Sequence, residues 1–410
     1  MRHTKTLGKG LRTVKYVVIL ADGMADEPIA ELGNKTPLEY AKTPGMDLLA
    51  SFGQLGMVRT VPKSMKPGSD VANLSVLGYD PESNYSGRSP LEALSVGVSM
   101  KSTDVVLRCN LVTLSEDEPY GQKTIIDHSS DEISTADADI LMNAVRDAFQ
   151  NELFSVYTGT SYRHITIWNH GEVLDLEPPH DHLGEKIGEF LPAEPLLRSM
   201  MEKSFAILND HPLNVQRANE GKNKANSLWF WGAGTKPHLQ NFEEKTGLKG
   251  TMISAVDLLK GIAVGAGMQI ALVEGATGSL DTNYLGKAQA AVGALLDDGN
   301  DFVYIHVEAP DEMGHQGIVS HKVQSIEMID RQIVSVVKDA LDRAGEDYRM
   351  LVLPDHPTPI RIRTHTSDPV PYVLYDNRWR EKKDIAYSEA AAANLPCLEE
   401  GYRLLDKLIN

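Results

Sequence analysis

The sequence predicts an α/β protein, in which a doubly wound, mainly parallel sheet carries a smaller inserted α+β domain. Three observations favour this class. Toward both ends of the chain, apolar strand-like runs alternate with helix-like segments. Each strand-like run there ends in a charged or glycine-bearing turn. The middle of the chain instead mixes shorter strands with helices. A chain of 410 residues exceeds one ordinary core, so two domains are expected. We expect residues 1–102 and 223–410 to form the sheet domain and residues 103–222 to form the insertion.

The elements of the sheet domain follow from periodicity and from their stop signals. Its strand-like runs are rich in β-branched and aromatic residues, and its helix-like runs close at glycine or aspartate. The segment 66–81, "KPGSDVANLSVLGYDP", is typical of a loop that opens into a short helix at Ser69. The expected strands are 15–23, 56–62, 267–275, 301–311 and 348–356, and the expected helices are 43–53, 285–298 and 320–345.

The insertion has a different pattern from the rest of the chain. Shorter alternating strands are expected at 104–114, 154–168 and 172–184, and a helix is expected at 134–149. This mixture without a regular strand–helix alternation indicates an α+β domain.

Charge and cysteine content exclude several classes of partner. Lys and Arg number 40 against 57 Asp and Glu, and the net charge of −17 argues against nucleic acid or an anionic membrane as a general partner. Cys109 and Cys397 do not make a disulfide framework, which suits a reducing compartment. The basic N-terminus contains only the short apolar run "YVVIL", too short for a signal peptide or a membrane span. We expect a cytoplasmic protein; a homo-oligomer is compatible with the sequence, which carries no signal for or against one.

The stretch "PDEMGH" follows the expected strand at 301–311 and combines a carboxylate with an imidazole. If a helical turn follows the strand, Asp311 and His315 are four residues apart and share one face. A carboxylate and a neutral imidazole on one face are suitable ligands for a divalent metal. The alternative is a solvated loop with a chance histidine.

Two further strand ends carry the same ligand types. Asp22 ends the first strand, Asp355 and His356 end the last, and His365 follows a Pro-containing loop. Ligands of α/β sheets bind outside the carboxyl ends of the strands, so we expect these side chains to lie together. Carboxylates and imidazoles without thiolates suit Mn²⁺, Zn²⁺ or Mg²⁺, with Mn²⁺ preferred, and six such side chains are enough for two ions. Two acidic residues beyond the first turn, Asp26 and Glu27, are expected to face solvent.

Ser69 is the candidate nucleophile for such a site. A pair of metal ions about 4 Å apart stabilises both oxygens of an in-line phosphoryl displacement. Ser69 follows Pro-Gly at the expected N-cap, where free N–H groups and the helix dipole favour an anion. Metal coordination would lower the pKa of its hydroxyl and activate it. The alternative is that Ser69 only caps its helix.

These residues carry a family resemblance. Stretches such as "ILADGMAD", "PGSDVANLSVLGYDP", "GRSPLEA", "LRCNLVTL", "YRHITIW", "ANSLWFWGAG" and "DEMGHQG" are similar to those of the archaeal-type cofactor-independent phosphoglycerate mutases of the alkaline phosphatase superfamily. The resemblance implies an alkaline-phosphatase-like fold and a glycolytic isomerase that interconverts 3-phosphoglycerate and 2-phosphoglycerate without a bisphosphoglycerate cofactor. It implies Ser69 as the phosphorylated residue, one metal ion at Asp311, His315 and His365, and another at Asp22, Ser69, Asp355 and His356.

The insertion supplies candidates for substrate binding. A mutase must hold its substrate while the phosphoryl group leaves and returns, so it needs further anion contacts and a lid that excludes water. Arginine suits this role because its guanidinium matches carboxylate and phosphate geometry. For each residue the alternative is an ordinary surface ion pair or turn contact. The candidates are Arg108 with Asn110, Asp127 with His128, Arg163 with His164, Arg217, Lys222, and His180 with Asp181.

One loop departs from the family pattern and keeps alternative functions open. After "RCNLVTL", relatives carry an Asp followed shortly by a small residue and Gly, whereas this chain has "IIDHSSDEIS". The alternatives are a phosphotransferase acting on another small hydroxy compound, as homoserine-kinase-like enzymes do, a phosphomonoesterase, and a metal-binding relative without catalysis. The "WFW" of residues 229–231 and Cys109 are expected to pack in the interior.

Overall fold

The computed structural model describes residues 14–410, so the basic N-terminal residues 1–13 lie outside the described part of the chain. The chain divides into two compact units. The larger unit comprises residues 14–85 and 238–410, and the inserted unit comprises residues 86–237. These limits place the expected boundaries at 103 and 222 inside the inserted unit. No helix among the described residues has the length and apolar character needed to cross a membrane.

An eight-stranded sheet forms the centre of the larger unit, in the order β13-β2-β12-β11-β1-β10-β8-β9. The pairs β11-β1, β1-β10, β10-β8 and β8-β9 are parallel, whereas β12 pairs antiparallel with both β11 and β2. The prediction of an α/β unit with a mainly parallel sheet is therefore confirmed. The strands are β1 (Lys15–Ala21), β2 (Gln54–Val58), β8 (Gly250–Ile253), β9 (Gln269–Ile270), β10 (Phe302–Val307), β11 (Tyr348–Leu353), β12 (Val370–Asp376) and β13 (Cys397–Leu398).

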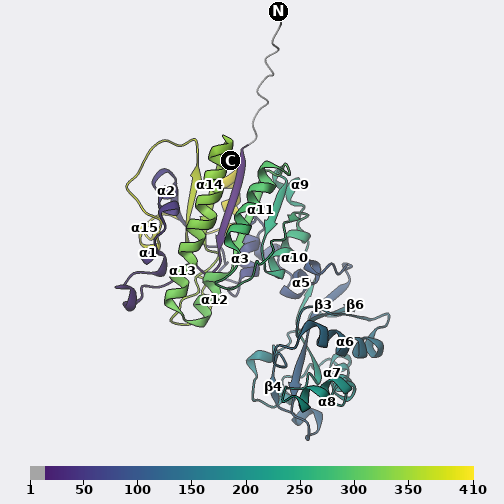
Figure 1. Cartoon of the computed structure of the whole chain (residues 1–410). Helices are drawn as coiled ribbons and strands as arrows, with labels where there is room; N and C mark the ends of the chain where they lie inside the picture. Colours follow the sequence, from purple (N-terminus) through teal and green to yellow (C-terminus); the bar gives the residue numbers. More distant parts are fainter. Residues whose placement is uncertain (1–13) are drawn as a thin grey trace, which may run out of the picture. The chain divides into compact units, whose positions relative to one another are not determined.

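Helices cover both faces of this sheet, as the strands' near-continuous apolar composition requires. One face packs in a single core with α2, α11, α13 and α14, and Figure 1 shows the last three running past the sheet. On the other face α10 contacts β8 and α16 contacts β11. The longer helices are α2 (Pro44–Phe52), α3 (Ser69–Val76), α10 (Asp257–Gly265), α11 (Tyr284–Leu296), α12 (Ala309–Gln316), α13 (Val319–Ile329), the π-helical η5 (Asp330–Val334), α14 (Ser335–Ala344) and α16 (Leu404–Ile409). The short ones are η1 (Ala30–Leu32), α1 (Pro37–Tyr40), α4 (Pro81–Asn84), α9 (Phe242–Thr246), α15 (Glu389–Ala392) and η6 (Gly401–Arg403).

The inserted unit is an antiparallel sheet packed with helices, as expected for an α+β domain. The long strand β3 pairs with β4, β6 and β7, and β6 pairs with β5. The strands are β3 (Asp104–Leu114), β4 (Ile125–Asp127), β5 (Phe154–Tyr157), β6 (Arg163–Asn169) and β7 (Ser227–Thr235). The helices are α5 (Arg88–Ser95), η2 (Tyr120–Gln122), α6 (Thr135–Phe149), η3 (Pro179–Asp181), η4 (Ile187–Glu189), α7 (Pro195–Leu208) and α8 (Pro212–Asn219).

Three expectations about local structure were wrong. The run at 267–275 contains only the two-residue edge strand β9, and its Leu272 is 80% exposed. The run at 172–184 holds no strand; its only regular element is η3. Asp26 does not face solvent, because its buried carboxylate lies 2.8 Å from the buried Nζ atom of Lys322. The expectation for Cys109 was confirmed, and that for the "WFW" stretch was confirmed in part, because Trp229 and Phe230 are buried whereas Trp231 is half-buried.

Candidate active site

Three adjacent strand ends bring the predicted acidic residues together. β11, β1 and β10 are neighbours in the sheet and run parallel, so their carboxyl ends share one edge. Asp355 follows β11, Asp22 follows β1, and Asp311 lies in the first turn of α12 after β10. All three carboxylates are buried. The expected meeting of acid-bearing strand ends at one edge is confirmed.

Ser69 lies at the same edge. It is the first residue of α3, and Gly68 is the N-cap, so the expected N-cap position was wrong by one residue. The Ser69 Oγ atom lies 3.3 Å from Oδ2 of Asp22 and 3.2 Å from Nε2 of His356. The hydroxyl therefore points into the group of carboxylates and imidazoles.

Hydrogen bonds orient the His356 ring. Thr358 donates its hydroxyl hydrogen to Oδ1 of Asp311, and its oxygen lies 3.3 Å from Nδ1 of His356. Since the Thr358 hydrogen is already used, Nδ1–H of His356 is the donor in the second contact. The lone pair is then on Nε2, which faces Ser69 and lies 3.5 Å from Oδ2 of Asp355. An imidazole held in this way by its second nitrogen is the usual arrangement of a metal-binding histidine.

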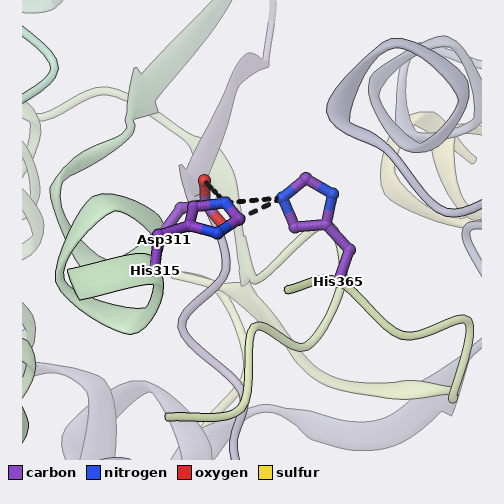
Figure 2. Close-up of side chains that lie close together, drawn as sticks. All are labelled: Asp311, His315 and His365. Carbon is purple, nitrogen blue, oxygen red and sulfur yellow. Dashed lines mark hydrogen bonds and ion pairs between the residues drawn. The ribbon is translucent and has the colours of Figure 1, made fainter. Parts of the chain in front are cut away.

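A second group consists of Asp311, His315 and His365, and Figure 2 shows the two rings turned toward each other beside the carboxylate. The Nε2 atoms of the two histidines are 3.0 Å apart, and that of His315 lies 3.1 Å from Oδ2 of Asp311. Nδ1 of His315 lies 2.9 Å from the Arg363 carbonyl oxygen and must donate to it, so in the neutral ring the lone pair is on Nε2. Arg363 itself has a positive φ of 55°, an uncommon conformation for a residue other than glycine.

The electrostatic environment of the buried carboxylates favours a bound cation. Oδ1 of Asp22 is buried and has no hydrogen-bond partner among the described residues. Burial, with further contributions from the nearby Asp355 and Asp311, raises the pKa of Asp22 well above its usual value. Potential ligand atoms of Asp22, Asp311 and His356 lie within 4.8 Å of one another, as do those of Asp311, His315 and His365. The residues present thus fit two divalent ions, because the donor types, the orphaned oxygen and the imidazole orientations all agree.

The two groups differ in the protonation of their histidines. The hydrogen bond with Asp311 raises the pKa of His315 to about 9. Burial opposes ionisation of Asp311, but hydrogen bonds from His315 and His365 outweigh it and hold the pKa of Asp311 well below its usual value. Burial lowers the pKa of His356. His356 is therefore ready as a neutral ligand, whereas metal binding at His315 must displace a proton.

Asp355 is held by donors from three segments. Its Oδ1 atom accepts the N–H groups of Gly23 at 3.1 Å and of His356 at 2.9 Å, and its Oδ2 atom accepts the Asn73 side chain at 3.0 Å. Gly23 has a positive φ of 60°, and a Cβ atom there would lie 2.5 Å from the Asp311 carboxylate, so only glycine fits this close approach.

Sequence reasoning missed three residues of the site: Asn73, His306 and Thr358. Asn73 lies one helical turn after Ser69, and Thr358 lies two residues after His356, so both have local signals. His306 is an imidazole inside the apolar run "FVYIHV", an unusual place for a polar side chain. Its Nε2 atom lies 2.8 Å from Oδ2 of Asp22.

In the inserted unit, Arg108 lies among aromatic and acidic side chains. Its Nε atom donates to Glu92 at 2.7 Å, and its guanidinium lies 4.6 Å from the centre of the Trp231 ring. Burial lowers the pKa of Arg108, and the charge of Glu92 opposes that shift. This arrangement keeps the Arg108 cation partly out of water, hydrogen-bonded to the Glu92 carboxylate.

Ring contacts connect Arg108 to the other candidates. His180 packs edge-on against Trp231 at 5.2 Å between ring centres and lies 6.0 Å from His128, which in turn lies 5.7 Å from Tyr162. The Arg163 guanidinium lies 4.9 Å from the centre of the Tyr162 ring. Nδ1 of His128 is buried and has no hydrogen-bond partner in the part of the chain that the structure describes. We call this group the arginine–aromatic cluster: Arg108, His128, Tyr162, Arg163, His180 and Trp231.

The structure places four other candidates outside this cluster. Arg217 is buried, and it donates to the carbonyl oxygens of Ser130 at 2.8 Å and Asn223 at 3.1 Å. These contacts give Arg217 a role in holding the loop after β4. Asp127 accepts backbone N–H groups of that loop, His164 is buried with its Nδ1 atom bound to the Gly159 N–H group, and Lys222 is exposed and pairs with Glu220.

Comparison with known proteins shows which family this chain resembles. The family model for 2,3-bisphosphoglycerate-independent phosphoglycerate mutase matches residues 50–214. A protein described as a probable enzyme of that name from Geobacter sulfurreducens is 47% identical over 404 residues, covering 97% of this chain and 100% of the relative. The enzyme of that name from Methanosarcina mazei is 45% identical over 387 residues, covering 93% and 96%.

Two solved structures resemble the whole chain. One, of a protein from Pyrococcus horikoshii, has a TM-score of 0.81 at 30% identity and covers 97% of both chains. The other, a cofactor-independent phosphoglycerate mutase from Thermoplasma acidophilum, has a TM-score of 0.66 at 26% identity and covers 97% of this chain and 99% of its own.

Proposed function

Because the chain belongs to the family of 2,3-bisphosphoglycerate-independent phosphoglycerate mutases, which are isomerases, we propose that it interconverts 3-phosphoglycerate and 2-phosphoglycerate through a phosphoserine at Ser69. The observation that carries the proposal is the position of the Ser69 hydroxyl, 3.3 Å from Asp22 and 3.2 Å from His356 at the start of a helix. A serine in that place combines a polarised hydroxyl with the anion-favouring end of a helix.

The reaction consists of two phosphoryl transfers that balance without a further reactant. In the first, Oγ of Ser69 bonds to phosphorus, the bond from phosphorus to the substrate oxygen breaks, and the serine proton passes to the departing hydroxyl. In the second, the oxygen of the other glycerate hydroxyl bonds to phosphorus, the bond from phosphorus to Oγ of Ser69 breaks, and the proton of that hydroxyl passes to Oγ of Ser69. The free N–H groups at the start of α3 favour the negative charge of the phosphoserine.

Two divalent ions complete the proposed site. We assign one ion to Asp311, His315 and His365, and the other to Asp22, Ser69, Asp355 and His356. Bound there, they would lower the pKa of the serine hydroxyl and neutralise charge on the transferring phosphoryl oxygens. Three imidazoles favour Mn²⁺ or Zn²⁺ over Ca²⁺, and Mn²⁺ is the ion we propose. No bisphosphoglycerate cofactor enters the scheme.

We assign substrate binding to the inserted unit, through its arginine–aromatic cluster. Arg163 is exposed, and the structure pairs it with the Tyr162 hydroxyl at 3.1 Å, so its guanidinium remains accessible to an anion. A carboxylate such as that of glycerate matches this fork in shape and charge. The unpartnered Nδ1 atom of His128 offers a further hydrogen bond in the same cluster. Asp127, His164, Arg217 and Lys222 support the unit around this cluster.

The physiological setting follows from the reaction. We propose a glycolytic role in a reducing cytoplasm, in keeping with the free cysteines Cys109 and Cys397.

One assay panel tests the function. Purified protein with Mn²⁺ is given 3-phosphoglycerate, and 2-phosphoglycerate formation is followed by coupling to enolase. Parallel reactions supply ATP with small hydroxy acceptors, and a third set measures inorganic phosphate release. The proposal requires the first reaction to exceed the other two by orders of magnitude. Transfer from ATP would instead identify a phosphotransferase, and phosphate release alone would identify a phosphomonoesterase.

A further inference from the structure

His306 connects three neighbouring strands beneath the proposed metal site. It lies in β10, opposite Leu20 of β1, and its side chain is fully buried. Its Nε2 atom is 2.8 Å from Oδ2 of Asp22, and its Nδ1 atom is 3.2 Å from Oγ of Ser254, directly after β8. Lys287, also fully buried, donates to the His306 carbonyl oxygen at 2.8 Å. Both the ring and the backbone of this residue are therefore held in place.

The hydrogen bonds determine which ring nitrogen carries the proton. The Ser254 oxygen accepts the N–H group of Val256 at 3.0 Å, so its own hydrogen is free to point at Nδ1 of His306. The Oδ2 atom of the Asp22 carboxylate accepts from Nε2, so Nε2 carries the N–H group of the ring and Nδ1 accepts the Ser254 hydrogen.

As a consequence, the two carboxylate oxygens of Asp22 differ in their hydrogen-bond partners. Oδ2 receives the His306 N–H group and lies 3.3 Å from the Ser69 hydroxyl, whereas Oδ1 has no hydrogen-bond partner within residues 14–410 and lies 3.6 Å from Nε2 of His356. We propose that His306 is a positioning residue, which fixes the Asp22 carboxylate so that Oδ1 is presented to a divalent cation. The inference rests on the proposed two-metal site, and it adds a residue that has no contact with substrate.

The test is the binding of Mn²⁺ alone to chelator-treated protein, measured by titration calorimetry. Wild type is expected to bind two ions. His306→Phe keeps a planar ring but loses the donor, and we expect one of the two affinities to fall by about 10- to 100-fold, the usual effect of losing such a supporting contact. His306→Gln returns an N–H group near the position of Nε2 and is expected to recover most of that loss. A residue that served only to fill space would not be rescued in this way.

Two further variants keep the result interpretable. Ile305→Val, at the next position of the same buried strand, controls for loosening of β10 and should leave both affinities unchanged. If His306→Phe fails to fold, Ser254→Ala removes the hydroxyl that selects the ring tautomer and should weaken one site by several-fold. Two unaltered affinities in a folded His306→Phe or Ser254→Ala protein would overturn the inference. Absence of Mn²⁺ binding to wild type would overturn the proposed metal site itself.

Discussion

The Nε2 atoms of His315 and His365 lie 3.0 Å apart, each on a ring that faces the other. Nδ1 of His315 donates to the carbonyl oxygen of Arg363, so its Nε2 atom presents a lone pair unless the ring is protonated. Two lone pairs at this separation repel, and either a shared proton or a metal ion relieves the repulsion. We therefore expect removal of metal to act directly on this pair of histidines.

Chelation is expected to inactivate the enzyme completely, and Mn²⁺ should restore activity far better than Ca²⁺, because imidazole nitrogen suits transition metals and Ca²⁺ prefers oxygen ligands. The measurement is mutase activity after chelator treatment and after readdition of each ion, with bound metal counted by elemental analysis. Full activity in protein shown to be metal-free would contradict the two-metal assignment.

Ser69→Ala should abolish turnover, with a loss of more than about 1,000-fold, because the residue that accepts the phosphoryl group is gone. Metal affinity should change little, since carboxylates and imidazoles remain. The measurements are enolase-coupled activity and Mn²⁺ calorimetry, together with mass spectrometry for a phosphorylated Ser69 peptide in wild type. Ser83→Ala, an exposed serine of α4 in the same unit, is the matched control. Wild-type turnover in Ser69→Ala would remove the nucleophile assignment.

Arg163→Ala should change the outcome of the reaction as well as its rate. If Arg163 holds the glycerate carboxylate, its loss lets glycerate leave before the second transfer, and water then takes the phosphoryl group. Mutase activity should fall by about 100-fold, equivalent to roughly 3 kcal/mol of charged hydrogen bonding, while phosphate release is maintained. The ratio of 2-phosphoglycerate to inorganic phosphate measures this directly. An equal fall of both products would assign Arg163 to initial binding instead.

Arg217→Ala should act on stability, in contrast to Arg163→Ala. Its buried guanidinium satisfies the carbonyl oxygens of Ser130 and Asn223 and lies 3.3 Å from Asp137. Removing it leaves buried acceptors without donors, at a cost of about 3 kcal/mol in the free energy of unfolding. Denaturant unfolding measures the change, with Lys222→Ala, an exposed residue of the same segment, as the control. Unchanged stability would show that the Arg217 contacts are not needed for the loop.

Glu389 gives a pH prediction that is independent of the metal site. Burial raises the pKa of Glu389 from 4.5 to about 7, although Thr36 and the N–H group of Asp26 donate to its carboxylate at 2.7 Å and 3.3 Å. Between about pH 4.5 and 7 the folded chain keeps a proton that the unfolded chain has released, so this group lowers stability as pH rises through that window. The full effect is roughly 3 kcal/mol.

Glu389→Gln removes this titration while keeping the shape of the side chain. The difference in unfolding free energy between Glu389→Gln and wild type should therefore grow in favour of the variant from pH 4.5 to 7 and then level off. Urea unfolding at a series of pH values, with the same metal content in both proteins, measures the difference. A difference that is flat across this range would contradict the prediction.

The sequence best predicted those residues whose positions depend on local sequence patterns. The strands that precede Asp22, Asp311 and Asp355 are continuous apolar runs, and parallel strands must end together at one edge, so their meeting followed from pattern and geometry. Helix α2 ended at Gly53 as its stop signal indicated. The proposed metal ligands also came from local motifs, in which an acid and a histidine follow one strand.

The features that sequence did not predict depend on distant partners. Asp26 resembles any polar residue after a turn, and only the fold shows that Lys322 reaches it across nearly 300 residues. An apolar run such as 267–275 does not reveal that it lies at a sheet edge with two residues paired. Arginine is the residue type expected to hold an anion, but the partners of Arg217 are backbone carbonyl oxygens. A pattern of side chains in the sequence does not predict such contacts.

The position of β1 between β10 and β11 has a consequence for synthesis of the protein. About 280 residues separate the end of β1 from the start of β10. At about 5–20 residues per second, the ribosome takes tens of seconds or more before β1 meets either neighbour. During that time an apolar strand has both edges open, and the nascent chain depends on chaperones or on slow non-local pairing to avoid aggregation. Chains cut short before residue 302 should therefore be recovered as aggregates. Synthesis of the last hundred residues supplies the strands that pair with β1 and so protects it from aggregation.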